Sequence, residues 1–269
     1  MKYIKKFANH AEHLAEKEQL ENLGVYLSYC EDIGESTLYY EKKQYPMPYD
    51  NEYVDQYLTI ETLEENTSIE IVLGNNFEQR SMTELYTSTN GITWHKQQLP
   101  YINGPNETLA VLFINAGSKL FFKGKVRNND VIFNNGNNSA ENNWEIKLRP
   151  SKNVKVYGNI MSLVYGDKFE NKTRMPNSTT MIFHNIFANS HFTDVENLML
   201  PCVEMQPYLY ADMFKGSGIT KSPILPAETL VTGCYNRMFS DCSSLNTIKC
   251  LNTTEFDSLY SNDWVKGVA

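Results

Sequence analysis

The residue types that most often carry chemistry are dispersed along this 269-residue chain. His10 and His13 flank Glu12 on an expected helix, but they lack the HEXXH spacing of a zinc helix, so an exposed helical face is the simpler interpretation. The other histidines stand apart from one another, and none lies near a Ser or Cys in a nucleophile-elbow sequence: His95, His184 and His191. We therefore expect no metal site and no catalytic residues.

Two further motifs have turn-like surroundings. Gly216-Ser217-Gly218 follows an apolar repeat position, where a turn is a better interpretation than a phosphate cradle. Glu64-Glu65 also lies in an expected turn, whereas glycosidase chemistry needs two carboxylates facing each other across a cleft. The sequence thus predicts a protein that is not an enzyme and has no cofactor.

The cysteines predict buried thiols rather than disulfides or zinc ligands. Their number is odd, and their spacing contains no C-x₂-C pair: Cys30, Cys202, Cys234, Cys242 and Cys250.

Three aromatic residues are the candidate ligand-binding residues. Tyr86, Trp94 and Tyr101 lie on or beside an expected hairpin at Asn90-Gly91, among polar neighbours. If exposed, they could stack on a sugar ring or fill a pocket of a partner protein. The alternative is that Trp94 packs in the protein core, and we favour it because aromatic side chains commonly anchor cores.

Composition excludes several classes of protein. With 41% hydrophobic and 21% charged residues, the chain can form an ordinary core. The 32 acidic residues exceed the 24 basic ones, giving a net charge of −8, which argues against a nucleic-acid partner. Mean hydropathy is −0.45, and no apolar run reaches the ~18 residues of a membrane span. Asn-rich turns such as residues 134–138 favour a mainly β protein.

The residues that could carry function must be positioned by three expected domains. Residues 1–55 form a leader module, with a helix from about residue 5 to 22 and strands at 25–29 and 36–40 that could pair as a hairpin. Prolines 46 and 48 then mark a linker.

Residues 56–150 are expected to form an antiparallel β-sandwich. Strand-like alternation begins at residues 57–63 and 67–73, and Asn90-Gly91 is typical of a type I′ hairpin turn. Residues 108–114 and 120–126 predict a second hairpin.

Residues 151–269 contain a repeat of about 25 residues, which is typical of a leucine-rich solenoid with one short strand and one short helix per copy. Trp264 and Leu259 are candidates for a C-terminal cap. The repeat is carried by three pairs: Leu200-Pro201 with Leu225-Pro226, Tyr210 with Tyr235, and Met213-Phe214 with Met238-Phe239.

Residues 225–245, LPAETLVTGCYNRMFSDCSSL, closely resemble the BspA-like leucine-rich repeat. Residues 158–167 resemble the segment that precedes such arrays in Bacteroidales proteins, and residues 57–65 and 114–124 resemble strands of the accompanying sandwich. Residues 1–7, with LSYCED at 27–32, resemble a leader of structural proteins from gut Bacteroidales phages and prophages. The resemblance implies adhesion or surface interaction, without shared catalytic residues.

These observations predict a non-catalytic binding or structural protein. We expect a phage virion-attached decoration or fibre protein, with residues 1–55 bound to a virion component and the remainder facing a host-surface protein or glycan. The charged start, without the apolar segment of a signal peptide, favours the virion over the alternative, an adhesin of the bacterial cell surface. A homo-oligomer is expected because fibres usually are oligomeric, and a glycan-cleaving enzyme is the least favoured class.

Overall fold

The computed structural model describes residues 3–7, 26–30, 35–40, 43–45, 56–73, 82–99, 107–126, 146–176, 182–252 and 258–268. These residues form a mainly β protein with mixed sheets and only short helical segments. The chain divides into two compact units, Met1–Asp50 and Asn51–Ala269.

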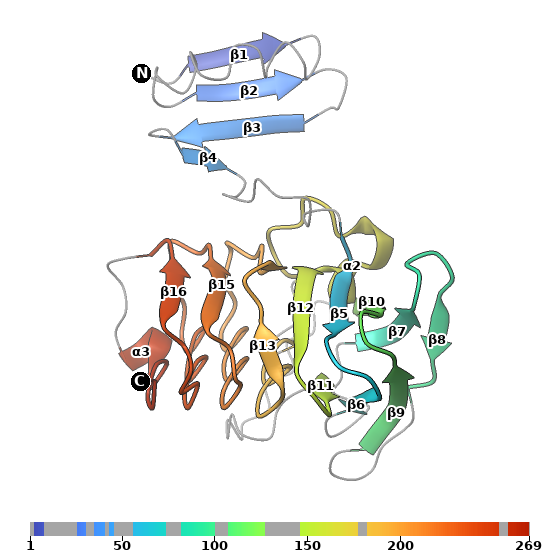
Figure 1. Cartoon of the computed structure of the whole chain (residues 1–269). Coiled ribbons are helices and arrows are strands. Elements are labelled where there is room, and N and C mark those ends of the chain that lie inside the picture. The colour runs from blue at the N-terminus through green and yellow to red at the C-terminus, as the bar shows by residue number, and fades with distance from the viewer. Residues whose placement is uncertain are drawn as a thin grey trace. The chain divides into compact units, whose positions relative to one another are not determined.

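The first unit contains a four-stranded sheet in chain order (Figure 1). The predicted hairpin within residues 25–40 is confirmed, because its two strands pair antiparallel from Tyr26↔Tyr39 to Cys30↔Glu35. The predicted start of a helix near residue 5 is wrong, because residues 5–7 belong to a strand that pairs in parallel with the next one; the rest of that expected helix lies outside the described residues. The strands are β1 (Tyr3–Phe7), β2 (Tyr26–Cys30), β3 (Glu35–Tyr40) and β4 (Lys43–Tyr45).

The larger sheet of the second unit is mixed, with the order β13-β12-β5-β10-β7-β8 and β14 also paired to β12. In Figure 1, β5 (blue) runs between β12 (yellow-green) and β10 (green), so segments far apart in sequence are neighbours. Its strands are β5 (Leu58–Thr62), β7 (Met82–Ser88), β8 (His95–Gln97), β10 (Lys119–Val126), β12 (Val154–Asn159), β13 (Phe192–Asp194) and β14 (Leu198–Met199).

A second sheet is antiparallel and has the order β11-β6-β9, with strands β6 (Thr67–Leu73), β9 (Glu107–Ile114) and β11 (Ile146–Pro150). Alternating side chains of both sheets enter one hydrophobic core, because a strand turns every second residue to the same face. Leu120 and Phe122 of β10 and Ile69 and Ile71 of β6 are examples, each at most 2% exposed.

The predicted hairpin of residues 108–114 with 120–126 is wrong. β9 pairs with β6, whereas β10 uses both of its edges to pair with β5 and β7, so it has no edge left for β9. The connecting turn, residues 115–118, therefore carries the chain from one sheet to the other.

The hairpin at Asn90-Gly91 exists as β7 and β8, but its connection is a six-residue loop rather than a two-residue type I′ turn. A type I′ turn needs positive φ at both central residues, and only Gly91 has it, at 71°. Side-chain hydrogen bonds to backbone amides hold the loop instead. The Ser88 hydroxyl accepts the Gly91 amide at 2.9 Å, and Asn90 Oδ1 accepts the Thr93 amide at 2.8 Å.

The repeat region is built from short parallel strands alternating with runs of turns. β15 (Lys221–Leu225) pairs in parallel with β16 (Thr247–Cys250), and Figure 1 shows β15 in orange and β16 in red. We call the runs at 182–190, 207–217, 232–242 and 259–268 the turn segments; the last of them begins within the short helix α3 (Ser258–Ser261). Amides of one turn segment donate to carbonyls of the next, about 25 residues later, as in Phe187 N to Met213 O (3.1 Å) and Phe214 N to Met238 O (3.0 Å).

The short helix predicted for each repeat is wrong for the first three turn segments, residues 182–242, which contain no helix. Alternate amides within a turn segment bond to the carbonyl three residues back, but the intervening amides point to the neighbouring segment. Positive φ at every fourth residue in most of these runs prevents helix propagation: Asn185, Asn189, Tyr208, Asp212, Arg237 and Asp241.

Aromatic rings stack in register between the turn segments. One column contains Phe187, Phe214 and Phe239, with centroids 5.6 and 5.7 Å apart, and Trp264 follows at 6.1 Å. Of the two predicted capping residues, Trp264 thus packs on the core, whereas Leu259 is 53% exposed.

Candidate functional site

A cavity of about 800 Å³ lies between β7, β10 and residues 164–176, and we call it the aromatic groove. Its lining combines aromatic rings with both signs of charge. The residues that matter here are Glu84, Tyr86, Trp94, Lys123, Tyr165 and Asp167.

The register of two strands places four of the lining residues together. β10 pairs with β7 so that Lys123 lies opposite Tyr86 and Lys125 lies opposite Glu84. Directly opposed residues project from the same face of a sheet, so these four side chains form one surface. The alternation that buries Phe122 in the core therefore turns Lys123 toward the groove.

The second wall is the short helix α2 (Ser162–Tyr165) with the 3₁₀ turn η2 (Gly166–Lys168). Gly124 of β10 allows α2 to lie close to this strand, because a Cβ atom at position 124 would lie 2.6 Å from the carbonyl oxygen of Leu163. The Ser162 hydroxyl donates to the Phe122 carbonyl at 2.9 Å and accepts the Leu58 amide at 3.0 Å, which fixes the helix to two strands of the sheet.

The Lys123 ammonium contacts three of the other groove residues. It lies 4.3 Å from the centroid of the Trp94 ring and 5.8 Å from that of Tyr86, which are cation–π distances, and 2.7 Å from Asp167 Oδ1. The Tyr57 hydroxyl donates to the same carboxylate oxygen at 2.7 Å, and its ring contacts Trp94 edge-on at 4.7 Å. The rings are thus held in place before any ligand arrives.

Three titratable groups in or beside the groove have shifted pKa values. Burial, followed by the hydrogen bond to Asp167, raises the pKa of Tyr57 to about 12. Hydrogen bonds from Lys123 and then Tyr57 lower the pKa of the Asp167 carboxyl. The Tyr86 hydroxyl, 2.8 Å from Glu84, is the main cause that lowers the pKa of that carboxyl. Both acids are therefore carboxylates, and Tyr57 is a neutral phenol.

Two of the three predicted ligand-binding residues meet in this groove. Tyr86 and Trp94 line it together, while Tyr101 lies outside the described residues. Trp94 is half-buried against Tyr57 and Lys123, so it is not one of the buried core side chains. Sequence reasoning missed Tyr57, Lys123 and Asp167, which come from distant parts of the chain.

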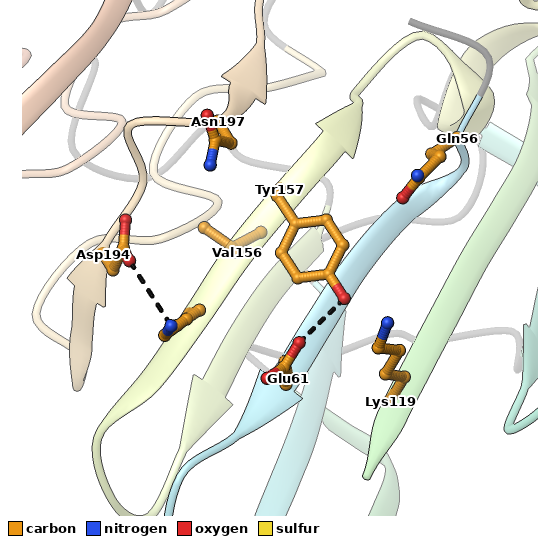
Figure 2. Close-up of a pocket in the computed structure, with 8 residues that line it drawn as sticks. Gln56, Glu61, Lys119, Val156, Tyr157, Asp194 and Asn197 are labelled. Carbon is orange, nitrogen blue, oxygen red and sulfur yellow. Dashed lines mark hydrogen bonds and ion pairs between the residues drawn. The ribbon is translucent and has the colours of Figure 1, made fainter. Parts of the chain in front are cut away.

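A second cavity, of about 320 Å³, lies over β5, β12 and residue 194 (Figure 2). In Figure 2 Tyr157 and Glu61 point toward each other, and the Tyr157 hydroxyl donates to Glu61 at 2.9 Å. Lys155 and Asp194 form an ion pair at 4.0 Å across it. Tyr157 is only 8% exposed, so this cavity offers little aromatic surface to a ligand, and the aromatic groove is the better candidate.

A buried ionic cluster connects three turn segments. Asp212, 1% exposed, accepts a hydrogen bond from Arg237 at 2.8 Å, and its Oδ2 lies 3.1 Å from His184 Nε2. Neither of the two cavities described above is lined by these residues, and their contacts indicate a structural role.

Other described features bear on the remaining expectations. Cys202, Cys234, Cys242 and Cys250 do not form disulfides. Among the described residues, no three His, Cys, Asp or Glu side chains are grouped as a metal would require. Over the same part of the chain, no helix has the length and apolar character needed to cross a membrane.

No protein-family model, curated protein or solved structure matches this chain.

Proposed function

We propose that this protein is a non-catalytic binding protein whose aromatic groove holds a sugar ring of a glycan. The observation that carries this proposal is the meeting of Tyr86 and Trp94 around the fixed Lys123–Asp167 pair in one open cavity. Aromatic rings provide a flat apolar surface for the C–H face of a sugar, and neighbouring charged groups can hydrogen-bond its hydroxyls.

The electrostatics of the groove support binding rather than glycan cleavage. A general acid for glycoside hydrolysis needs a raised pKa so that its proton is present at neutral pH. Asp167 and Glu84 have lowered pKa values, and each already accepts a hydrogen bond from a tyrosine.

We propose a specific architecture for the second unit: an antiparallel β-sandwich over residues 56–150, followed by a short leucine-rich solenoid over residues 151–269. The first strands of the second part, β12, β13 and β14, continue the larger sheet of the first part. The sandwich is supported by the hydrophobic core that the two sheets share. The solenoid is supported by the hydrogen bonds and stacked rings that recur about every 25 residues in the turn segments.

For the biological setting, we propose a virion-attached decoration or fibre protein, oligomeric as fibres are, with residues 1–55 binding the virion. The alternative is an adhesin of the bacterial cell surface. The resemblances of residues 1–7 and 27–32 to a phage leader and of residues 225–245 to BspA-like repeats support this setting. Deleting residues 1–55 tests it: loss of incorporation into particles is expected, and undiminished incorporation would rule out the anchoring role.

A glycan array with the full chain tests the binding proposal. Trp94→Ala should weaken binding of a captured glycan about 30-fold, which corresponds to about 2 kcal/mol for a central aromatic contact. Ile92→Ala is the matched control, since Ile92 belongs to the same loop, is 83% exposed and does not line the groove. If no glycan binds, or if both variants bind like the wild type, the proposal is wrong.

A further inference from the structure

The charge of the aromatic groove is opposite in sign to that of the whole chain. Its lining contains four cations, Lys123, Lys125, Lys168 and Arg174, against two carboxylates. The groove therefore carries a formal charge of about +2 on a protein whose net charge is −8. A local excess of cations in an acidic protein is a feature that a ligand could use.

The two carboxylates are engaged by the protein itself. Asp167 binds Lys123 and the Tyr57 hydroxyl, and Glu84 binds the Tyr86 hydroxyl and lies 3.5 Å from Lys96. Because Lys123 is the cation that neutralises Asp167, the positive charge that a ligand would meet comes from the remaining three.

Those three cations, Lys125, Lys168 and Arg174, are exposed. Across the described residues, no carboxylate lies within ion-pair distance of them. They come from β10, from η2 and from the segment after it, so they surround the cavity from separate elements. The Tyr165 hydroxyl donates to the Arg174 carbonyl at 2.8 Å, which ties the backbone of Arg174 to the groove wall.

We infer that the aromatic groove binds an acidic saccharide, in which a sugar ring rests on Trp94 and Tyr86 and an attached carboxylate or sulfate faces Lys125, Lys168 and Arg174. This inference rests on the proposed function and narrows its ligand class. A guanidinium pairs with a carboxylate or a sulfate through two parallel N–H bonds, and ammonium groups add a less directional attraction.

The test is calorimetric titration of the full chain with oligosaccharides of matched length. The probes are a hexagalacturonate, which carries carboxylates, a chondroitin sulfate hexasaccharide, which carries carboxylates and sulfates, neutral maltohexaose, and inorganic sulfate alone. We expect an acidic hexasaccharide to bind at least about tenfold more tightly than maltohexaose. The affinity for the acidic hexasaccharide should fall when NaCl is raised from about 50 to about 500 mM, because salt screens exposed charges.

Charge-neutralising variants locate the effect. Arg174→Gln and Lys125→Gln should each reduce affinity for the acidic hexasaccharide about tenfold. Lys266→Gln is the matched control, since it removes one exposed cation at a turn segment outside the groove. Thermal unfolding followed by circular dichroism checks that every variant is folded.

The possible outcomes separate the inference from the proposed function. Equal or tighter binding of maltohexaose overturns the acidic-ligand inference and leaves glycan binding intact. Binding of inorganic sulfate as tight as that of the hexasaccharides overturns it as well, because the sugar ring then contributes nothing. Failure of every saccharide probe, together with an empty glycan array, overturns both.

Discussion

At the scale of single residues, the Asp212 carboxylate is a buried charge held by several neighbours. It is almost fully buried, and it contacts His184 and Arg237 from the turn segments before and after its own. The Lys215 ammonium lies 3.9 Å from Oδ1 of Asp212. A buried ion held in this way stabilises little relative to an apolar core, but removing the carboxylate takes an ionic partner from buried His184 and from partly buried Arg237.

Asp212→Asn should lower the free energy of unfolding by about 3 kcal/mol, because buried His184 and partly buried Arg237 then lose the carboxylate that they share. Urea denaturation measures the effect. Asp263→Asn is a close control: Asp263 has the same positive φ of 53°, but its pair with Lys266 is exposed. We expect a change of less than about 0.5 kcal/mol there. Equal losses in the two variants would contradict the assigned role of Asp212.

The same carboxylate predicts a pH dependence of stability. Burial alone would raise the pKa of Asp212, but hydrogen bonds from His184 and Arg237 outweigh it and hold the pKa below its usual value. A lowered pKa in the folded state means that the stabilisation is complete above the unfolded-state pKa of ~3.9 and is lost as pH falls through the folded-state pKa. The stability difference between wild type and Asp212→Asn should therefore narrow below about pH 4. Urea midpoints between pH 7 and pH 3 test this, and a constant difference would contradict it.

At the scale of elements, Gly124 decides how closely α2 lies against β10. A Cβ atom at this position would lie 2.6 Å from the Leu163 carbonyl oxygen and 2.8 Å from that of Glu84, and neither backbone oxygen can move freely. The wall of the aromatic groove thus depends on a residue without a side chain.

Gly124→Ala should lower the free energy of unfolding by about 2 kcal/mol through this overpacking, and it should weaken glycan binding by displacing the wall. Denaturation and the glycan array measure the two effects. In the control Gly218→Ala the added Cβ would meet Thr193 at an ordinary 3.5 Å, so stability should stay within about 1 kcal/mol of wild type. If Gly124→Ala were as stable as the wild type, the close approach of α2 to β10 would be ruled out.

The sequence predicts local strand pairing better than long-range pairing. The hairpin of β2 and β3 follows from adjacent β-prone segments, and the pairing of β7 with β8 follows from Asn90-Gly91. The partner of β9 could not be predicted in this way, because it depends on which strand edges remain free after the sheets form. Helices were expected in the repeats because apolar spacing does not reveal that alternate amides bond to the next turn segment.

The aromatic groove could be predicted only in part for the same reason. Tyr86 and Trp94 lie in one hairpin, so their proximity is local and follows from the sequence. Tyr57 and Asp167 are 110 residues apart, and they meet only through the pairing of β5 with β10 and the docking of α2. Lys123 lies between two buried positions of an alternating strand, and this pattern predicts only that its side chain is on the face opposite the core.

At the scale of the whole molecule, the reactivity of buried cysteines can measure unfolding of the second unit. Cys202 and Cys234 are fully buried, and burial is the main cause that raises their pKa to about 12 and about 11. Their alkylation by iodoacetamide at pH 8 should be slow in the native protein and rapid in urea, since only an exposed thiolate reacts. Peptide mapping measures this, with half-buried Cys250 as internal reference. Burial also raises the pKa of Cys250 to about 11, so this cysteine differs from Cys234 in exposure rather than in pKa. Native labelling of Cys202 as fast as that of Cys250 would contradict the expectation.

The hydrogen bonds between turn segments have an evolutionary consequence. Each segment meets its neighbours through the same backbone atoms, so a gene duplication that adds one whole segment with its strand could be accommodated without altering the others. The ionic cluster is an exception, because His184, Asp212 and Arg237 occupy three consecutive segments. Glu196 is a second exception, because it pairs with Lys221 and Lys249 of the two following copies. A duplication within either group would separate its charges, so an added segment is accommodated better after residue 249 than before it.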